Sequence, residues 1–110
     1  MRIGKHTFAP NGGVYVVNTA SIAGPNEGRG RYGSYYDAGL ADHDWDCKTH
    51  EKTAIKKHKY AIEQALEKSG RGRQGIDCRV GGEQCKPLAA STFGAREVGS
   101  TLPGVYLAVA

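Results

Sequence analysis

The most constraining feature of the sequence is a long stretch, from Asp37 to Ser69, that contains no proline and only one glycine, Gly39. Because proline and glycine are the residues that most disfavour a helix interior, this stretch is free to be helical over most of its length. In its second half, one set of residues recurs at intervals of three or four and so forms a single helix face, with lysines and glutamates on the other side. The residues of this face are Ile55, His58, Ile62 and Leu66.

The apolar pattern lapses over residues 48–51, which read Lys-Thr-His-Glu. We therefore expect two helices, about 37–48 and about 51–68, which form a hairpin or are fused into one helix. Gly70 follows the second helix, at a position where glycine commonly ends a helix in a left-handed conformation.

Two short runs near the ends of the sequence are rich in β-branched and aromatic residues, which is typical of strands. They cover residues 13–18 and 104–109, and both contain the tripeptide Gly-Val-Tyr. We predict the α+β fold class: a helical hairpin at about 37–69 packed against a small sheet formed by these terminal strands. A chain of 110 residues has the size of one domain, so residues 1–110 are expected to form a single domain.

The chain is basic, with a formal net charge of +4 and a pI of about 9.1. This charge favours an acidic partner, such as nucleic acid, anionic lipid or an acidic protein. No apolar run approaches the roughly 20 residues that a membrane-spanning helix needs, so no transmembrane segment is expected. No signal-peptide pattern opens the sequence.

The chain has three cysteines, Cys47, Cys78 and Cys85, and an odd number argues against a complete disulfide framework. Cys78 and Cys85 flank a loop that contains two glycines, so they could pair in an oxidising compartment and leave Cys47 free. Three reduced thiols are an equally consistent alternative.

A Gly-Arg hexapeptide occurs twice: residues 28–33 read Gly-Arg-Gly-Arg-Tyr-Gly and residues 70–75 read Gly-Arg-Gly-Arg-Gln-Gly. Such loops expose backbone N–H groups beside guanidinium groups, a combination that suits phosphate. The pattern predicts an anion-binding surface, with two exposed turns as the alternative. Its arginines are Arg29, Arg31, Arg71 and Arg73.

A His-Asp pair, His43 and Asp44, lies on the first expected helix, behind a glycine-rich loop that begins at Gly24. A histidine that a neighbour orients can deprotonate water as a general base. The adjacent carboxylate can hold a cation such as calcium, and glycine carbonyls can supply further oxygen ligands. Together these groups predict metal-assisted ester hydrolysis. The alternative is a solvated helix end, where acidic residues are favoured by the helix dipole.

The pattern Asp-x5-His-Asp behind a Gly-Pro loop resembles the active-site helix of the phospholipase A2 superfamily, and most closely the viral form in parvovirus capsid proteins. The resemblance covers residues 24–47. It implies that His43 is the general base, that Asp44 is a calcium ligand, and that carbonyls around Gly24 complete the calcium site.

The same region offers a second kind of metal site, because His43, Cys47 and His50 fall at i, i+4 and i+7 of a helix. Zinc accepts these ligand types, but the sequence offers no evident fourth ligand.

Two functions follow from these patterns. The first is a small basic binding or assembly subunit that docks on an acidic partner through its Gly-Arg loops, as part of a larger assembly. The alternative is a calcium-dependent, phospholipase A2-like hydrolase of lipid esters that uses the His-Asp pair. Only the second function requires a cofactor, calcium.

Overall fold

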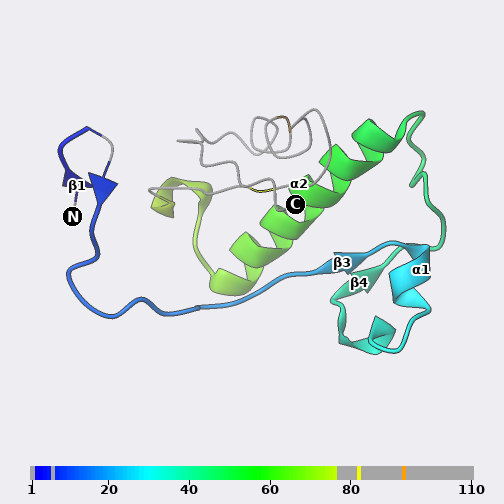
Figure 1. Ribbon diagram of the computed structural model, residues 1–110, viewed down its shortest axis with the longest axis horizontal. Coiled ribbons are helices and arrows are strands. Elements are labelled where there is room, and N and C mark those ends of the chain that lie inside the picture. The colour runs from blue at the N-terminus through cyan, green and yellow to red at the C-terminus, as the bar shows by residue number, and fades with distance from the viewer. Residues whose placement is uncertain (1, 6, 77–81, 83–92, 94–110) are drawn as a thin grey trace.

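The structure is a computed structural model that describes residues 2–5, 7–76, 82 and 93 of the chain. Its largest element is one long helix, α2, beside which a small sheet and two short helical turns are packed (Figure 1). In chain order the elements are β1 (Arg2–Ile3), β2 (Thr7–Phe8), β3 (Ile22–Ala23), α1 (Pro25–Gly28), η1 (Gly33–Tyr35), β4 (Ala38–Gly39), α2 (His50–Ser69) and η2 (Arg73–Gly75).

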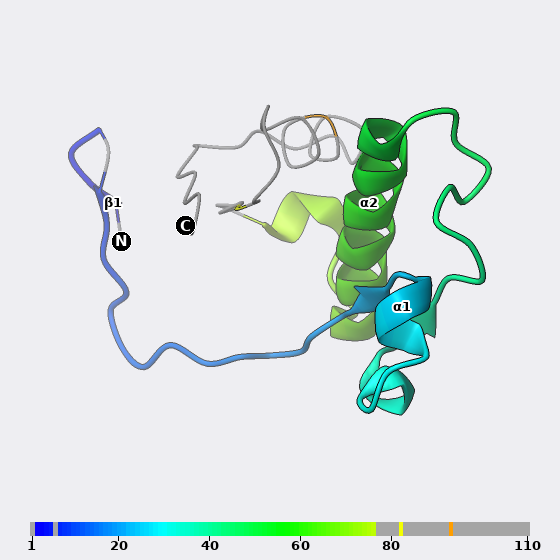
Figure 2. The ribbon, with the colours of Figure 1, turned by 45° about the vertical axis from the view of Figure 1, so that its right-hand side comes forward.

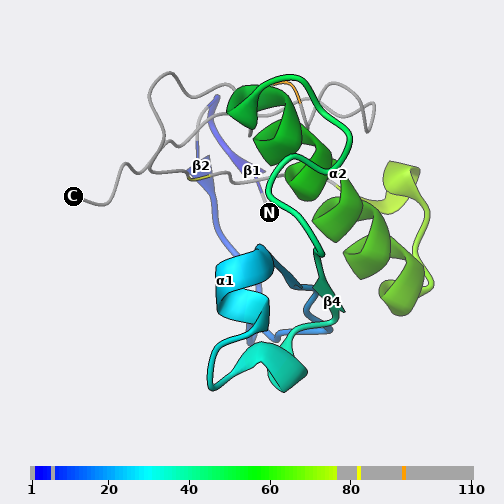
Figure 3. The same cartoon turned by 90° about the vertical axis from the view of Figure 1, so that its right-hand side faces the viewer.

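Strands β3 and β4 form a parallel pair in which Ile22 lies opposite Ala38 and Ala23 lies opposite Gly39. The backbone N–H of Leu40 donates to the carbonyl of Ala23 at 3.0 Å and so prolongs the ladder beyond β4. Parallel strands need a crossover connection, and here α1 and η1 supply it. Strand β3 contacts both α1 and α2, so this small sheet is joined to the long helix (Figure 3).

Helix α2 has a clear signal at each end. The side chain of Thr49 accepts a hydrogen bond from the backbone N–H of Lys52 at 3.3 Å, which satisfies a donor that the first turn leaves open. Gly70 ends the helix with φ of 65°, and its N–H donates to the carbonyl of Glu67. The expected second helix and its glycine cap are therefore confirmed.

The buried core of the described residues is small. Ala23 is 2% exposed, Thr53 is 3% exposed, and Pro25 is buried at the start of α1. The residues of the α2 face that the sequence predicts as buried, including Ile62 and Leu66, are only half-buried. Among the described residues, the buried ones therefore lie at the junction of β3, α1 and the first half of α2.

The mixed α+β class is confirmed, but the first helix of the expected hairpin is not formed. In place of a helix over 37–48 the chain has β4 and a series of turns. The Asp42 carboxylate accepts hydrogen bonds from the backbone N–H groups of Asp44 and Trp45 at 3.0 and 2.6 Å, which favours a turn over a helix. Trp45 and Asp46 then have positive φ angles of 43° and 60°, which end any helical path before α2 begins.

The sheet of terminal strands is not observed either. Residues 13–18 run as an extended segment from β2 toward α2, with no strand paired to them in the described part of the chain (Figures 1 and 2). The two described sheets pair β1 with β2 and β3 with β4. The other expected strand, 104–109, lies outside the described residues, and so do Cys78 and Cys85. A single domain over residues 1–110 stays a prediction.

Among the described residues, no helix combines the length and the apolar character that a membrane span requires.

Candidate functional site

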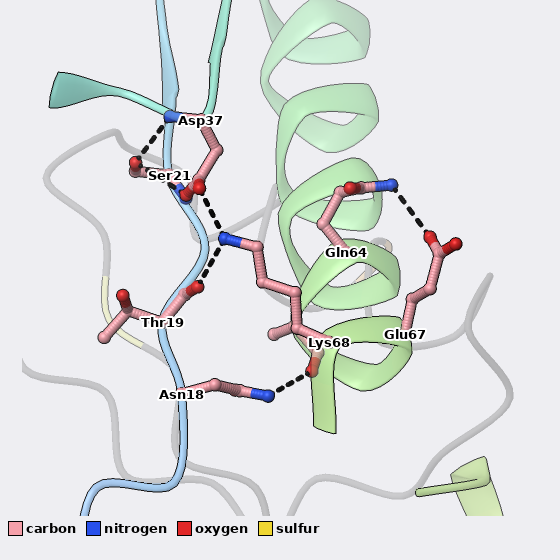
Figure 4. A network of polar contacts seen from close by, with 8 residues as sticks. Asn18, Thr19, Ser21, Asp37, Gln64, Glu67 and Lys68 are labelled. Atoms are coloured by element: carbon pink, nitrogen blue, oxygen red, sulfur yellow. Dashed lines mark hydrogen bonds and ion pairs between the residues drawn. The ribbon is translucent and has the colours of Figure 1, made fainter. Parts of the chain in front are cut away.

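A network of polar contacts joins three segments that are far apart in the sequence (Figure 4). The Asp37 carboxylate accepts hydrogen bonds from the backbone N–H of Ser21 at 2.7 Å and from its hydroxyl at 3.0 Å. The ammonium group of Lys68, from the last turn of α2, bonds the same carboxylate and donates to the carbonyl of Thr19 at 2.9 Å. We call Thr19, Ser21, Asp37 and Lys68 the polar clip.

The clip sets the charge state of its carboxylate. The hydrogen bond from Lys68, followed by those from Ser21, lowers the pKa of Asp37 below its ordinary value. Both Asp37 and Lys68 remain about one-third exposed, at 33% and 38% of their side chains. An ionised carboxylate that already accepts three hydrogen bonds is suited to hold segments together, because its lone pairs are largely occupied.

Next to the clip, a hollow of about 380 Å³ opens between the extended N-terminal segment and the second half of α2. The side-chain amide of Asn18 closes one side by donating to the carbonyl of Ala65 at 2.9 Å. Most of the hollow's lining is apolar, and its residues are Val17, Asn18, Ile62, Ala65, Leu66, Ser69, Arg71 and Ile76. The helix face that the sequence predicts as core is therefore partly open at this place.

A second cluster fixes the loop before α2. The ammonium group of Lys56 lies 4.5 Å from the centre of the Trp45 ring and donates to the Trp45 carbonyl at 2.8 Å. The Trp45 ring also meets Tyr60 edge-on, with ring centres 5.7 Å apart. The hydroxyl of Thr53 is within hydrogen-bond distance of the carbonyls of Asp44 and Thr49, at 2.9 and 3.1 Å.

The His-Asp pair of the sequence analysis lies in this loop and not on a helix. His43 and Asp44 are exposed, and the backbone of Asp44 is engaged on both sides, by Asp42 and by Thr53. Gly24 precedes α1, and its carbonyl accepts the backbone N–H of Gly28 at 2.9 Å. A Cβ added at Gly24 would lie 3.2 Å from a carboxylate oxygen of Glu27 and 3.5 Å from the ammonium nitrogen of Lys57, so side chains of both charges lie beside this glycine.

The stripe expected for zinc does not form, because His43 and Cys47 lie in the loop and only His50 belongs to α2. Cys47 is a free thiol. Within the described ranges, no three histidine, cysteine or acidic side chains gather as metal ligands would.

The arginines of the two Gly-Arg hexapeptides each have a neighbour within the chain. Arg29 donates to the Asn26 side chain at 3.2 Å, and the guanidinium carbon of Arg31 lies 5.7 Å from the centre of the Tyr32 ring. Arg73 pairs with Glu63 at 3.4 Å, and the backbone N–H of Arg71 donates to the Ser69 hydroxyl at 3.1 Å.

The two hexapeptides do not share one surface. All three ribbon views place the turns after α1 and the turn after α2 at separate parts of the molecule (Figures 1, 2 and 3). The hairpin that was expected to bring them together is absent, since residues 37–48 are not helical. Anion binding by Arg29, Arg31, Arg71 and Arg73 therefore stays a prediction for each loop separately.

Sequence reasoning missed the residues that make the tertiary contacts. Ser21 and Lys68 have no local signal, because their partner Asp37 lies 16 and 31 positions away. Thr53 stands among lysines on α2, and its burial has no counterpart in the apolar pattern. Of these residues, only Asp42 could have been recognised from the sequence as a turn residue, since aspartate commonly accepts hydrogen bonds from the backbone two or three residues ahead in a turn.

These contacts define the class of protein: a small mixed α+β unit in which a polar clip holds one long helix against a two-stranded parallel sheet. The family model of Stage V sporulation protein AD (SpoVAD) matches residues 4–110. The match covers nearly the whole chain, so the chain belongs to the SpoVAD family. No curated protein matches it.

The family corrects both functions predicted from the sequence. The resemblance to the phospholipase A2 superfamily over residues 24–47 is wrong, and with it the calcium-dependent lipid-ester hydrolase. The family indicates a sporulation-related protein and gives no support to docking on an acidic partner through the Gly-Arg loops. Short spacings such as Asp-x5-His-Asp arise by chance in unrelated chains. Without the hydrolase, calcium binding is an untested expectation that no longer has a chemical role to support it.

Proposed function

We propose that this chain acts in sporulation, at the stage that its family's name states, as a subunit of a larger assembly. The observation that carries the proposal is the match to the SpoVAD family over residues 4–110. A match of this extent includes α2, the β3–β4 sheet and the polar clip, whereas the phospholipase resemblance rested on one short motif.

The exposed apolar surface supports the assembly part of the proposal. Scattered apolar side chains are normal on a protein surface, but contiguous ones mark interaction sites. Here the partly open hollow beside α2 adjoins an extended segment with consecutive exposed apolar residues. In the part of the chain that the structure describes, the large hydrophobic residues that are more than half exposed are Ile3, Val14, Tyr15, Val16, Val17, Tyr32 and Tyr35.

The sporulation role is tested by deleting the coding sequence in the spore-forming host and counting mature, heat-resistant spores. We expect normal vegetative growth and a spore yield that falls by orders of magnitude, with development stopping late. A plasmid copy of the gene should restore the yield. An unchanged yield in the deletion strain would contradict the proposed function.

The assembly is tested separately, by native size fractionation of extracts from sporulating cells. The chain should migrate well above the size of a dimer of the purified chain, and it should shift to smaller sizes in mild detergent or high salt. Migration at the size of the purified chain alone would remove the assembly from the proposal and leave the sporulation role standing.

A further inference from the structure

The segment between β2 and β3 crosses the surface without joining a described helix or sheet. Residues 13–21 have no regular secondary structure and run as an extended line toward β3 (Figures 1 and 2). Val14, Tyr15, Val16 and Val17 are 80%, 82%, 83% and 70% exposed. Another protein can therefore reach the side chains of four consecutive residues.

The backbone of these four residues is open as well. Among the described residues, no hydrogen bond joins an N–H or a carbonyl between Gly13 and Val17 to another group. An extended peptide binds to another protein as an added β-strand, through its main-chain hydrogen bonds, while pockets take its side chains. A protease binds its substrate in this form, so a helix or a paired strand must unfold locally before it can be cut. Residues 14–17 already have the required form.

The chain on either side of this segment is held by separate contacts. On one side β1 pairs with β2, and in the described sheets neither strand pairs with another element. On the other side Asn18 donates to the carbonyl of Ala65 and Lys68 donates to the carbonyl of Thr19, both at 2.9 Å (Figure 4). A break ahead of Asn18 would therefore cut the covalent link between the β1–β2 hairpin and α2, and would leave the polar clip intact.

The side chains select one bond within the segment. Tyr15 is its aromatic residue, and a Cβ added at Gly13 would lie 2.6 Å from the Tyr15 hydroxyl oxygen. The ring thus lies over its own backbone and is not packed into the core. Because it is 82% exposed, it is free to enter the deep apolar pocket in which proteases of the chymotrypsin class hold the residue before the cut.

We propose that the peptide bond between Tyr15 and Val16 is an endoproteolytic processing site, cut by a protease that binds an aromatic side chain before the bond. Water is the co-reactant. Its hydroxyl adds to the carbonyl carbon of Tyr15, the C–N bond breaks, and the nitrogen of Val16 takes the proton. The products are residues 1–15 and a chain that begins at Val16. This inference rests on the segment alone and not on the role in sporulation.

Exposure alone does not single out this bond, because Tyr35 is equally exposed, at 82%. Tyr35 lies in η1, where its N–H donates to the carbonyl of Tyr32 at 3.0 Å and the N–H of Tyr36 donates to the carbonyl of Gly33 at 3.4 Å. This turn must open before a protease can bind it as a strand. We expect cleavage after Tyr35 to be at least about tenfold slower, which corresponds to an opening free energy of about 1.4 kcal/mol.

The test is limited digestion of the purified chain with chymotrypsin, in which mass spectrometry follows each bond separately. Fragments that end at Tyr15 should appear before any that end at Tyr32, Tyr35 or Tyr60. Tyr15→Asp should slow this cut at least about tenfold, because a carboxylate does not suit the apolar pocket. Tyr35→Asp is the matched control and should leave the rate at Tyr15 unchanged. Circular dichroism should show that both variants fold and that α2 persists after the cut.

Processing in cells is tested by the N-terminus of the chain isolated from the host, where a form that begins at Val16 is expected. Val16→Pro should abolish this form, because a proline after the bond blocks cleavage. The variant removes no hydrogen bond, since the N–H of Val16 is unpaired among the described residues.

Two outcomes would overturn the proposal. The first is a chymotrypsin cut after Tyr15 that is no faster than the cut after Tyr35, which would show that the segment is not presented as an open strand. The second is a chain that is recovered from the host only with residues 1–15 still attached. Neither outcome bears on the spore yield of the deletion strain, so the sporulation role is judged separately.

Discussion

Asp37 is the residue on which three segments converge, since it bonds Ser21 ahead of β3 and Lys68 at the end of α2. These bonds lower the pKa of Asp37, so its carboxylate stabilises the fold above the ordinary carboxylate pKa of about 4 and this contribution is lost as the pH falls through the lowered value. Asp37→Asn should therefore reduce the thermal midpoint at pH 7. The difference from wild type should shrink toward zero in strong acid. Thermal unfolding across this pH range, followed by circular dichroism, is the measurement.

The matched control is Asp46→Asn, which removes the same charge from a residue whose side chain makes no hydrogen bond in the described structure. Asparagine also tolerates the positive φ of 60° at this position. The control should show little change in its thermal midpoint at any pH. Raising the salt concentration should narrow the gap between wild type and Asp37→Asn, because the Asp37–Lys68 pair is partly exposed. A gap of constant size from neutral to acid pH would show that the lost stability does not come from the carboxylate charge.

At the scale of the element, α2 depends on Gly70 for its C-terminal end. Gly70 has φ of 65°, and an added Cβ would meet no atom within 4 Å. The substitution Gly70→Ala therefore tests the backbone conformation without a steric clash. An L-residue in this region costs about 1–2 kcal/mol, so Gly70→Ala should lower the free energy of unfolding by that amount. Urea denaturation measures it.

Gly72→Ala is the comparison, because a Cβ at Gly72 also meets open space but its φ is −71°, which any residue adopts. This variant should be neutral or slightly more stable, since alanine lowers the entropy of the unfolded chain. Equal effects of the two substitutions would argue that the left-handed cap contributes nothing to the stability of α2.

At the scale of the whole molecule, stability depends on the small junction where Ala23 of β3 packs against α1 and α2. Ala23 is 2% exposed, so the larger side chain of Ala23→Leu must displace its neighbours. Overpacking of this kind costs about 1–3 kcal/mol, and we expect the free energy of unfolding to fall within that range. Ala41→Leu, at an exposed position of the loop before α2, should change it by less than about 0.5 kcal/mol. If the Ala23→Leu variant were as stable as the wild type, the junction around Ala23 would not be tightly packed, and the stability of the protein would depend on other contacts.

Helix α2 and its end at Gly70 could be predicted from local residues, because a helix is specified by contacts between residues three and four positions apart and by caps at fixed offsets. The mixed α+β class could also be predicted from the sequence. The prediction of a helix over residues 37–48 was wrong, because the absence of proline permits a helix without requiring one. Asp42 and the positive φ angles at Trp45 and Asp46 favour turns there instead.

The candidate sites could not be predicted in this way, because they depend on contacts between residues that are distant in the sequence. The hydrogen-bond partners of Asp37 are Ser21 and Lys68, which lie 16 and 31 positions away. Hydrogen bonds between such distant residues produce no periodic pattern in the sequence. The His-Asp spacing matched a catalytic motif. That spacing places the two side chains in the motif's arrangement only if they lie on a helix, and His43 lies in a loop. Strand propensity at Val14–Val17 could be predicted, since it is a property of the residues. Whether such a run is paired or open depends on where the rest of the chain lies, and the fold leaves this run at the surface.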